Sequence, residues 1–217
     1  MMELNQETLF GKKVISTISF NEQEIIRDIL FLHADGKYID CDPTYSVGNF
    51  YKDGLPKPRL KFDLAPQIAG VVQADARNLP LEDLSINILM FDPPFICGIP
   101  AEAPTGIIRE RFGFYKNVPE LWQFYLDAIR EFERVIAPKG LLIFKCQDTV
   151  DGGKNYFTHC QVLNMAVETG FYPKDLFILA AKNRIVDVPM DSQQHARKFH
   201  SYFWVFEKIK SKVNYVK

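Results

Sequence analysis

Short apolar runs alternate along the chain with segments of helical period, and stretches rich in glycine, proline and polar residues separate them. Runs of this length are typical of buried strands, whereas apolar residues spaced three and four apart indicate amphipathic helices. We predict strands at residues 38–42, 59–63, 71–75, 86–92, 141–146, 176–181 and 201–207, with a short edge segment at 12–16.

Three segments carry a helical pattern bounded by recognisable start and stop residues. Asn21 suits an N-cap, because its side chain can accept a backbone hydrogen bond and Glu24 follows three residues later. Proline is favoured at the first helical position, and glycine after the last. The predicted helices begin at Asn21, Pro119 and Tyr156, and end at Asp35-Gly36, Pro138-Lys139-Gly140 and Gly170, respectively.

Strands alternating with helices predict one α/β domain with an open, mostly parallel sheet of about seven strands. We expect it to occupy residues 1–217, with 1–20 as an N-terminal segment and 209–217 as a frayed tail. The chain between Asp63 and Val71 is too short for a helix, so one face of the sheet needs other cover. The N-terminal helix, a second subunit in a homodimer, or nucleic acid would supply it.

An acid stands at the end of each of the first four predicted strands: Asp42, Asp63, Asp75 and Asp92. Parallel strands present their carboxyl ends at one edge of the sheet, where open α/β sheets bind ligands. Asp is also a good turn and cap residue, which is the structural alternative. Four in succession favour a shared crevice.

The last of these acids opens the sequence Asp92-Pro93-Pro94-Phe95. Proline has no backbone donor and a fixed φ, so the ladder must stop there and the acid stands on a stiff corner. The carboxylate and nearby carbonyls accept hydrogen bonds, and the ring of Phe95 offers a stacking face. This combination suits a planar group that carries an amine, such as a nucleobase. A plain strand-ending turn is the alternative.

Composition narrows the class of protein. Hydrophobic residues make up 47% of the chain, which is typical of a globular protein, and no apolar run is long enough to span a bilayer. Residues 1–13 lack an apolar signal core, so we expect a cytoplasmic protein. The net charge of −1 means that any basic surface must be local.

The four cysteines, at positions 41, 97, 146 and 160, lack a C-x-x-C pair. We interpret them as reduced thiols and predict no metal. A zinc site that these cysteines form with His195 or His200 is the alternative.

In the order and spacing of these motifs, the chain resembles the S-adenosylmethionine-dependent amino-methyltransferases, which methylate exocyclic amines of adenine or cytosine. It is also similar to small methylases of bacteria and their viruses. The resemblance implies a Rossmann-like class I methyltransferase fold and S-adenosyl-L-methionine as cofactor. Asp92-Pro93-Pro94-Phe95 matches the family's catalytic motif. The cofactor-binding residues it implies are Asp42, Pro43, Thr44, Tyr45 and Gly48 in the first motif, Asp63 for the ribose, and Asp75 with Ala76 for the adenine.

The first motif departs from the family pattern, since Ser46 replaces the earlier glycine and the aromatic residue is displaced by one position. Two long loops, 96–118 and 183–198, interleave basic and aromatic residues, as nucleic-acid contacts do. We predict that DNA is the partner, with RNA as the alternative. The predicted substrate-binding residues are Arg109, Arg111, Lys116, Arg197 and the motif-like His200, with Arg184 and Lys198 as further phosphate contacts.

Several alternatives remain open at this point. The first motif residue is Asp rather than Ser, which favours adenine N6 over cytosine N4. RNA would serve as well as DNA. A protein glutamine amide is a third acceptor, against which the Asp counts, because families acting on it tend to have Asn at that position. The altered first motif also allows a catalytically silent member of the fold that binds nucleic acid.

Overall fold

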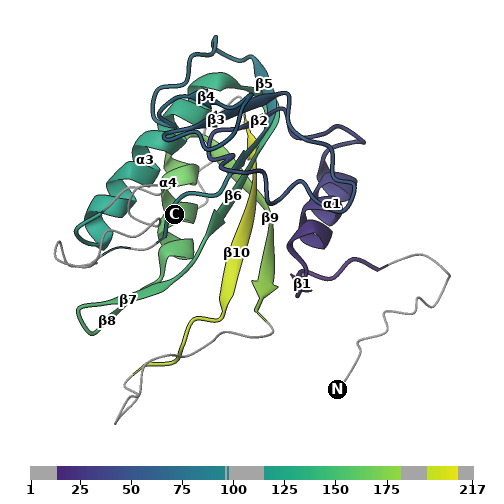
Figure 1. Ribbon diagram of the computed structural model, residues 1–217. Coiled ribbons are helices and arrows are strands. Elements are labelled where there is room, and N and C mark those ends of the chain that lie inside the picture. Colours follow the sequence, from purple (N-terminus) through teal and green to yellow (C-terminus); the bar gives the residue numbers. More distant parts are fainter. Residues whose placement is uncertain (1–13, 96, 98–114, 182–194, 210–217) are drawn as a thin grey trace.

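The computed structural model describes residues 14–95, 97, 115–181 and 195–209. Its centre is an eight-stranded sheet, one strand more than predicted, with helices on both faces (Figure 1). The strands are β1 (Ile18–Ser19), β2 (Cys41–Asp42), β3 (Leu60–Asp63), β4 (Val72–Gln73), β5 (Ile86–Phe91), β6 (Ile136–Cys146), β9 (Phe171–Ala180) and β10 (His200–Lys208).

The strand order is β1-β9-β10-β6-β5-β2-β3-β4. β6, β5, β2, β3 and β4 run parallel, and only β10 runs antiparallel to its neighbours β6 and β9. The four strands that precede the predicted acids are therefore adjacent and parallel, as expected. Their carboxyl ends meet at one edge of the sheet.

Helix α1 (Glu22–His33) begins at Asn21, whose side chain accepts a hydrogen bond from the backbone N–H of Glu24, as predicted. Helix α3 (Val118–Val135) carries a proline in its first turn and is capped by Asn117. Helix α4 (Thr158–Thr169) ends at Gly170, whose positive φ of 124° suits a glycine. The predicted N-cap of α1 and the predicted glycine at the end of α4 are therefore confirmed.

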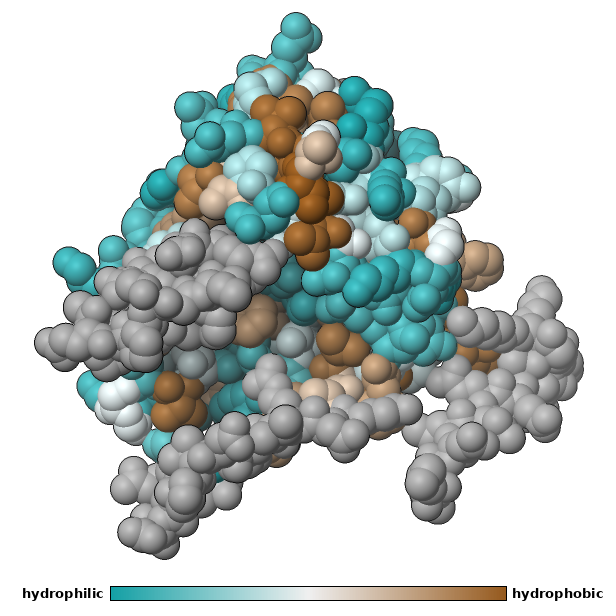
Figure 2. Space-filling model, in the orientation of Figure 1, coloured by the Kyte–Doolittle hydropathy of each residue, from teal (hydrophilic) through white to brown (hydrophobic). Residues whose placement is uncertain are grey.

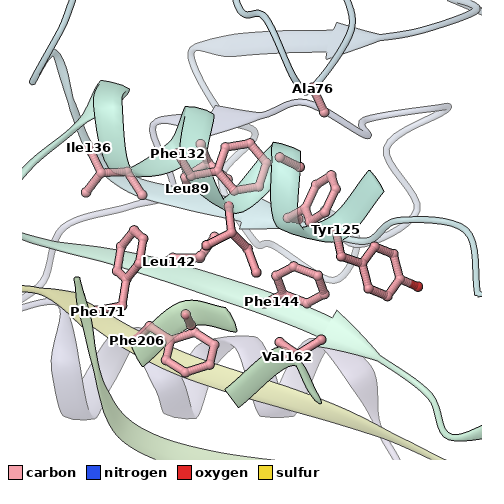
Figure 3. Packing of buried hydrophobic residues seen from close by; sticks show 14 of the residues in the cluster. Ala76, Leu89, Tyr125, Phe132, Ile136, Leu142, Phe144, Val162, Phe171 and Phe206 are labelled. Carbon is pink, nitrogen blue, oxygen red and sulfur yellow. The ribbon is translucent and has the colours of Figure 1, made fainter. Parts of the chain in front are cut away.

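Alternation along the central strands divides the core between the two faces of the sheet. On β5, Leu89 and Phe91 face α3 and α4, whereas Ile88 and Met90 face α1. The first cluster gathers large aromatic rings between helix and sheet (Figure 3). α1 buries Ile25, Ile26 and Ile29 in the second cluster and so covers the face that was predicted to lack a crossover helix.

Three details differ from the prediction. α3 ends at Val135 because Ile136 already has extended backbone angles, and Pro138-Lys139-Gly140 lies inside β6 rather than ending the helix. Gly140 is needed there: a Cβ would stand 2.7 Å from the carbonyl oxygen of Asn87. A two-stranded hairpin that was not predicted, β7 (Thr149–Asp151) and β8 (Lys154–Tyr156), turns at Gly152-Gly153.

The molecular face in Figure 2 is mainly hydrophilic, with a narrow apolar strip in the upper part of the view. Large exposed apolar side chains are spread over several elements rather than forming one element's face; they include Phe31 of α1 and Val72 of β4. Within the described residues, every helix is too short or too polar to cross a membrane.

Candidate active site

The proline corner after β5 is fixed from two sides. The Asp92 backbone N–H donates to Oγ1 of Thr44, which follows β2, at 2.9 Å. From the helical face, the buried Tyr125 of α3 donates its hydroxyl hydrogen to the carbonyl oxygen of Pro94 at 2.7 Å. Two neighbouring strand ends and a helix therefore define where the Asp92 side chain stands.

Asp42 is an internal brace of this arrangement. It is fully buried; its Oδ1 accepts hydrogen bonds from the backbone N–H and hydroxyl of Thr44, and its Oδ2 accepts one from Tyr51. Burial raises the pKa of Asp42 to about 7 against the effect of these hydrogen bonds. The structure places Asp42 behind the site surface, where it holds Thr44 in the position that receives Asp92.

Asp63 and the first motif lie in contact. Ser46 has a φ of 52°, the left-handed conformation that favours the glycine found here in the resembling family. Its backbone N–H donates to Asp63 Oδ2 at 2.9 Å, and that of Ala65 donates to Oδ1 at 2.8 Å. The serine therefore adopts a backbone conformation that glycine reaches without strain. Gly48 packs against Tyr45 so closely that a Cβ would lie 2.5 Å from the tyrosine oxygen.

Asp75 belongs to a tight turn after β4. Its carboxylate accepts hydrogen bonds from the side chain and the backbone N–H of Arg77, and these bonds to the guanidinium lower its pKa. The Arg77 guanidinium also lies over the ring of Phe124, 5.6 Å from its centroid. Asp75 is thus held in place as an anion at the rim of the sheet.

Two hollows that share no lining residue flank the proline corner. The first, which we call the strand-end crevice, contains about 80 Å³ and is lined by the ends of β2, β3, β4 and β5. The second, the acceptor cavity, contains about 430 Å³ and lies between the start of α1, β6, the end of β9 and the start of β10. The crevice is lined by Pro43, Thr44, Asp63, Leu64, Ala74, Asp75, Ala76, Arg77, Asp92, Pro94, Tyr115 and Phe124.

Asp92 differs from the other three acids in its contacts. Its Oδ1 is buried and accepts no hydrogen bond from the described residues. The nearest charge is the ammonium of Lys145 on β6, 3.5 Å from Oδ1. Burial raises the pKa of Asp92 to about 6, although Lys145 acts in the opposite direction. The structure therefore presents a carboxylate oxygen with unused acceptor capacity in the strand-end crevice, close to Lys145 of the acceptor cavity.

The structure brings many of the predicted residues together and places others elsewhere. Seven line the strand-end crevice: Pro43, Thr44, Asp63, Asp75, Ala76, Asp92 and Pro94. Phe95 and His200 line the acceptor cavity, where His200 also bonds to the Tyr202 hydroxyl. Tyr45 is buried in the core. Lys116 and Arg197 are exposed, and Lys198 lies over Phe157. Arg109, Arg111 and Arg184 fall outside the described residues.

Sequence reasoning missed Lys145, Glu22 and the hydroxyl groups of Tyr51 and Tyr125. Lys145 interrupts an otherwise apolar strand, and this isolated charge was the available signal. Tyr125 lies on the buried face of α3, and a buried tyrosine usually finds a partner for its hydroxyl. Within the described residues, no three His, Cys, Asp or Glu side chains gather as a metal site.

No protein-family model matches the chain, and no curated protein matches its sequence. Among solved structures, it is similar to TrmN from Thermus thermophilus at 15% identity and TM-score 0.50, over 86% of this chain and 49% of that one. A structure described as a sarcosine dimethylglycine methyltransferase from Galdieria sulphuraria is 12% identical, with TM-score 0.51, over 86% and 85%.

A third structure, described as a DNA modification methylase from Thermus thermophilus in complex with S-adenosyl-L-methionine, aligns at TM-score 0.44 and 16% identity. The alignment covers 66% of this chain and 57% of that one, so the chain spans little more than half of the methylase's length. Because identities are low, the two structures that align at a TM-score of 0.50 or above show the fold alone. The chain has the Rossmann-like class I methyltransferase fold, with a mostly parallel central sheet.

Proposed function

We propose that the protein transfers a methyl group from S-adenosyl-L-methionine to an exocyclic amine of a nucleobase, adenine N6 in DNA. One observation carries the proposal. Of the four acids at the strand ends, Asp92 alone has a buried carboxylate oxygen that accepts no hydrogen bond from the described residues; it lines the strand-end crevice, 3.5 Å from Lys145 in the wall of the acceptor cavity. Asp42, Asp63 and Asp75 are all held by donors.

The strand-end crevice suits the cofactor in its chemistry. Two backbone N–H groups orient Asp63, and an ionised carboxylate keeps further acceptor sites for ribose hydroxyls. Leu64 and Phe124 add apolar walls. The hollow is much smaller than the roughly 300–1,000 Å³ of typical ligand pockets, so we expect it to hold only part of the cofactor. When bound, the cofactor supplies an electrophilic methyl group.

The acceptor cavity suits the base. Its volume of about 430 Å³ lies within the usual range for ligand pockets, and Phe95 provides a stacking face in its wall. A base in duplex DNA must leave the helical stack to reach such a site. Lys116, Arg197 and Lys198 are the described candidates for phosphate contacts, which would position the strand without specifying its sequence.

In the proposed reaction, Asp92 and the Pro93 carbonyl accept the two N–H groups of the target amine. These bonds draw the nitrogen toward tetrahedral geometry and free the lone pair that the ring delocalises. Catalysis then consists mainly of alignment and charge stabilisation. With a pKa of about 6, Asp92 is suited to take the proton that the amine gives up.

Methyl transfer should depend on Asp92 but cofactor binding should not. The test incubates the protein with methyl-labelled cofactor and separate DNA and RNA pools, followed by nucleoside analysis. We expect label in N6-methyladenine from DNA, and none with Asp92→Ala, which should still bind the cofactor in calorimetry. Label in RNA alone would move the substrate to RNA, and an Asp92→Ala variant as active as the wild type would refute the mechanism.

The ribose assignment has its own test. Asp63→Ala should weaken cofactor binding by roughly tenfold or more, because it removes a charged acceptor. Exposed Asp53 serves as the control, and Asp53→Ala should bind the cofactor as the wild type does. Unchanged calorimetric affinity in Asp63→Ala would sink the assignment.

A further inference from the structure

Lys145 is a buried cation in the wall of the acceptor cavity. It occupies a position of β6 that faces α1, next to Ile143 of the second core cluster, and its side chain is only 11% exposed. The ammonium lies 2.6 Å from Glu22 Oε1 at the start of α1. It also lies over the rings of Phe50 and Phe203, at 4.8 and 5.6 Å from their centroids.

The contacts of this ammonium leave hydrogen-bonding capacity beside Asp92. An ammonium carries three N–H donors, and among the described residues Glu22 is the one acceptor within hydrogen-bond distance. The 3.5 Å to Asp92 Oδ1 exceeds the usual N–H···O range. Glu22 and Asp92 together outweigh the burial of Lys145 and raise its pKa, so it stays a cation. A charged donor and a charged acceptor therefore stand side by side.

This pair is complementary to one edge of an aminated base. In adenine and cytosine, a single carbon separates the amine from a ring nitrogen that accepts hydrogen bonds. A base whose amine meets Asp92 brings that nitrogen next to Lys145. Resting on the proposed function, we propose that Lys145 determines acceptor specificity by donating a hydrogen bond to the ring nitrogen adjacent to the methylated amine.

The arrangement selects against bases that lack this pair of groups. Thymine and the O6 edge of guanine present a carbonyl oxygen where Asp92 requires an N–H. Glu22 accepts a hydrogen bond from the ammonium of Lys145, so the first turn of α1 contributes to the acceptor cavity. α1 then serves the chemistry as well as the core.

Base analogues test the inference directly. Three pools of single-stranded DNA of equal length would carry adenine, 1-deazaadenine or 7-deazaadenine at every adenine position. A fourth pool would carry 3-deazacytosine in place of cytosine. Each deaza base keeps the amine and loses one ring nitrogen. For the wild type, we expect kcat/KM to fall about tenfold to a hundredfold on 1-deazaadenine, or on 3-deazacytosine if cytosine is the acceptor, as for the loss of a hydrogen bond to a charged group. 7-Deazaadenine keeps the ring nitrogen adjacent to the amine and should be methylated like adenine.

The matching variant is Lys145→Met, which keeps the aliphatic stem and removes the charge. Its kcat/KM on the natural base should fall by a similar factor, and its kcat/KM on the sensitive analogue should equal that of the wild type. If Lys145→Met does not fold, Lys145→Arg is the second variant, because it retains the cation. Its donors are shifted, so it should still change the ratio of kcat/KM between the natural base and the analogue. Lys208→Met is the control, since Lys208 is equally buried and is bound to Glu133 of α3, away from both hollows.

The outcomes separate the two proposals. Methyl transfer in which the wild type treats every analogue like its natural base would overturn the inference alone. So would a Lys145→Met variant that loses the same factor on all pools, because Lys145 would then act only through Asp92. An absence of methyl transfer to every pool would overturn the proposed function and the role of Lys145 with it.

Discussion

At the scale of single residues, the four strand-end acids share a residue type and a place in the fold but differ in contacts. Asp42 is a buried brace, Asp63 is oriented by backbone N–H groups, and Asp75 is tied to Arg77. The buried Oδ1 of Asp92 accepts no hydrogen bond from the described residues, and the Lys145 ammonium lies 3.5 Å from it. The spacing in the sequence predicted that they would meet at one edge. The spacing did not predict how their contacts differ, because these contacts depend on Tyr51, Ser46 and Arg77 in the folded chain.

The burial of Asp92 should make stability depend on pH. Its pKa rises from 3.8 to about 6 on folding, so the folded protein holds this proton more tightly than the unfolded chain does. Its contribution is most favourable below pH 4 and is lost as the pH rises through 6, by on the order of 3 kcal/mol. Asp92→Asn has no such loss, so the melting temperature of this variant relative to that of the wild type should rise between pH 4.5 and 7.5. A difference that stays constant with pH would contradict this.

At the scale of elements, β5 and its proline corner owe their position to β2 on one side and α3 on the other. The apolar run and the two prolines made the end of this strand predictable. The Tyr125 hydroxyl and the Thr44 side chain, which fix its direction, lie 31 and 48 residues away in sequence. Such contacts follow from packing, which hydrophobic period alone does not specify.

The tyrosine can be tested by removing one oxygen. Tyr125→Phe leaves the Pro94 carbonyl without its buried donor and should lower the free energy of unfolding by about 1–2 kcal/mol. Because the corner carries Asp92, the rate of methyl transfer should fall while cofactor affinity holds. Urea denaturation and single-turnover kinetics measure the two effects. Tyr38→Phe, at an exposed tyrosine, should change neither.

At the scale of the whole molecule, the helices divide their tasks between the two faces of the sheet. α3 and α4 cover one face, and α1 covers the other, where the chain between β3 and β4 is too short to form a helix (Figure 1). Helix–strand alternation predicted the parallel sheet. The hairpin of β7 and β8 went unpredicted because its strands are three residues long and mainly polar.

Loosening α1 should therefore damage both the core and the acceptor cavity. Ile26→Ala opens a cavity at a fully buried position and should cost about 2–4 kcal/mol of stability. Under conditions where the variant is still folded, methyl transfer should fall, because the first turn of α1 carries Glu22, the partner of Lys145. The control is Phe31→Ala on the same helix, 77% exposed, which should leave stability and rate nearly unchanged. Equal losses in both variants would speak against this role of α1.

The absence of any common lining residue between the strand-end crevice and the acceptor cavity has a kinetic consequence. In the proposed reaction, the methyl donor and the acceptor occupy separate hollows on the two sides of the proline corner. Neither has to leave before the other enters. Spent cofactor can then be exchanged while the nucleic acid stays bound, so that successive amines on one strand are modified within a single encounter.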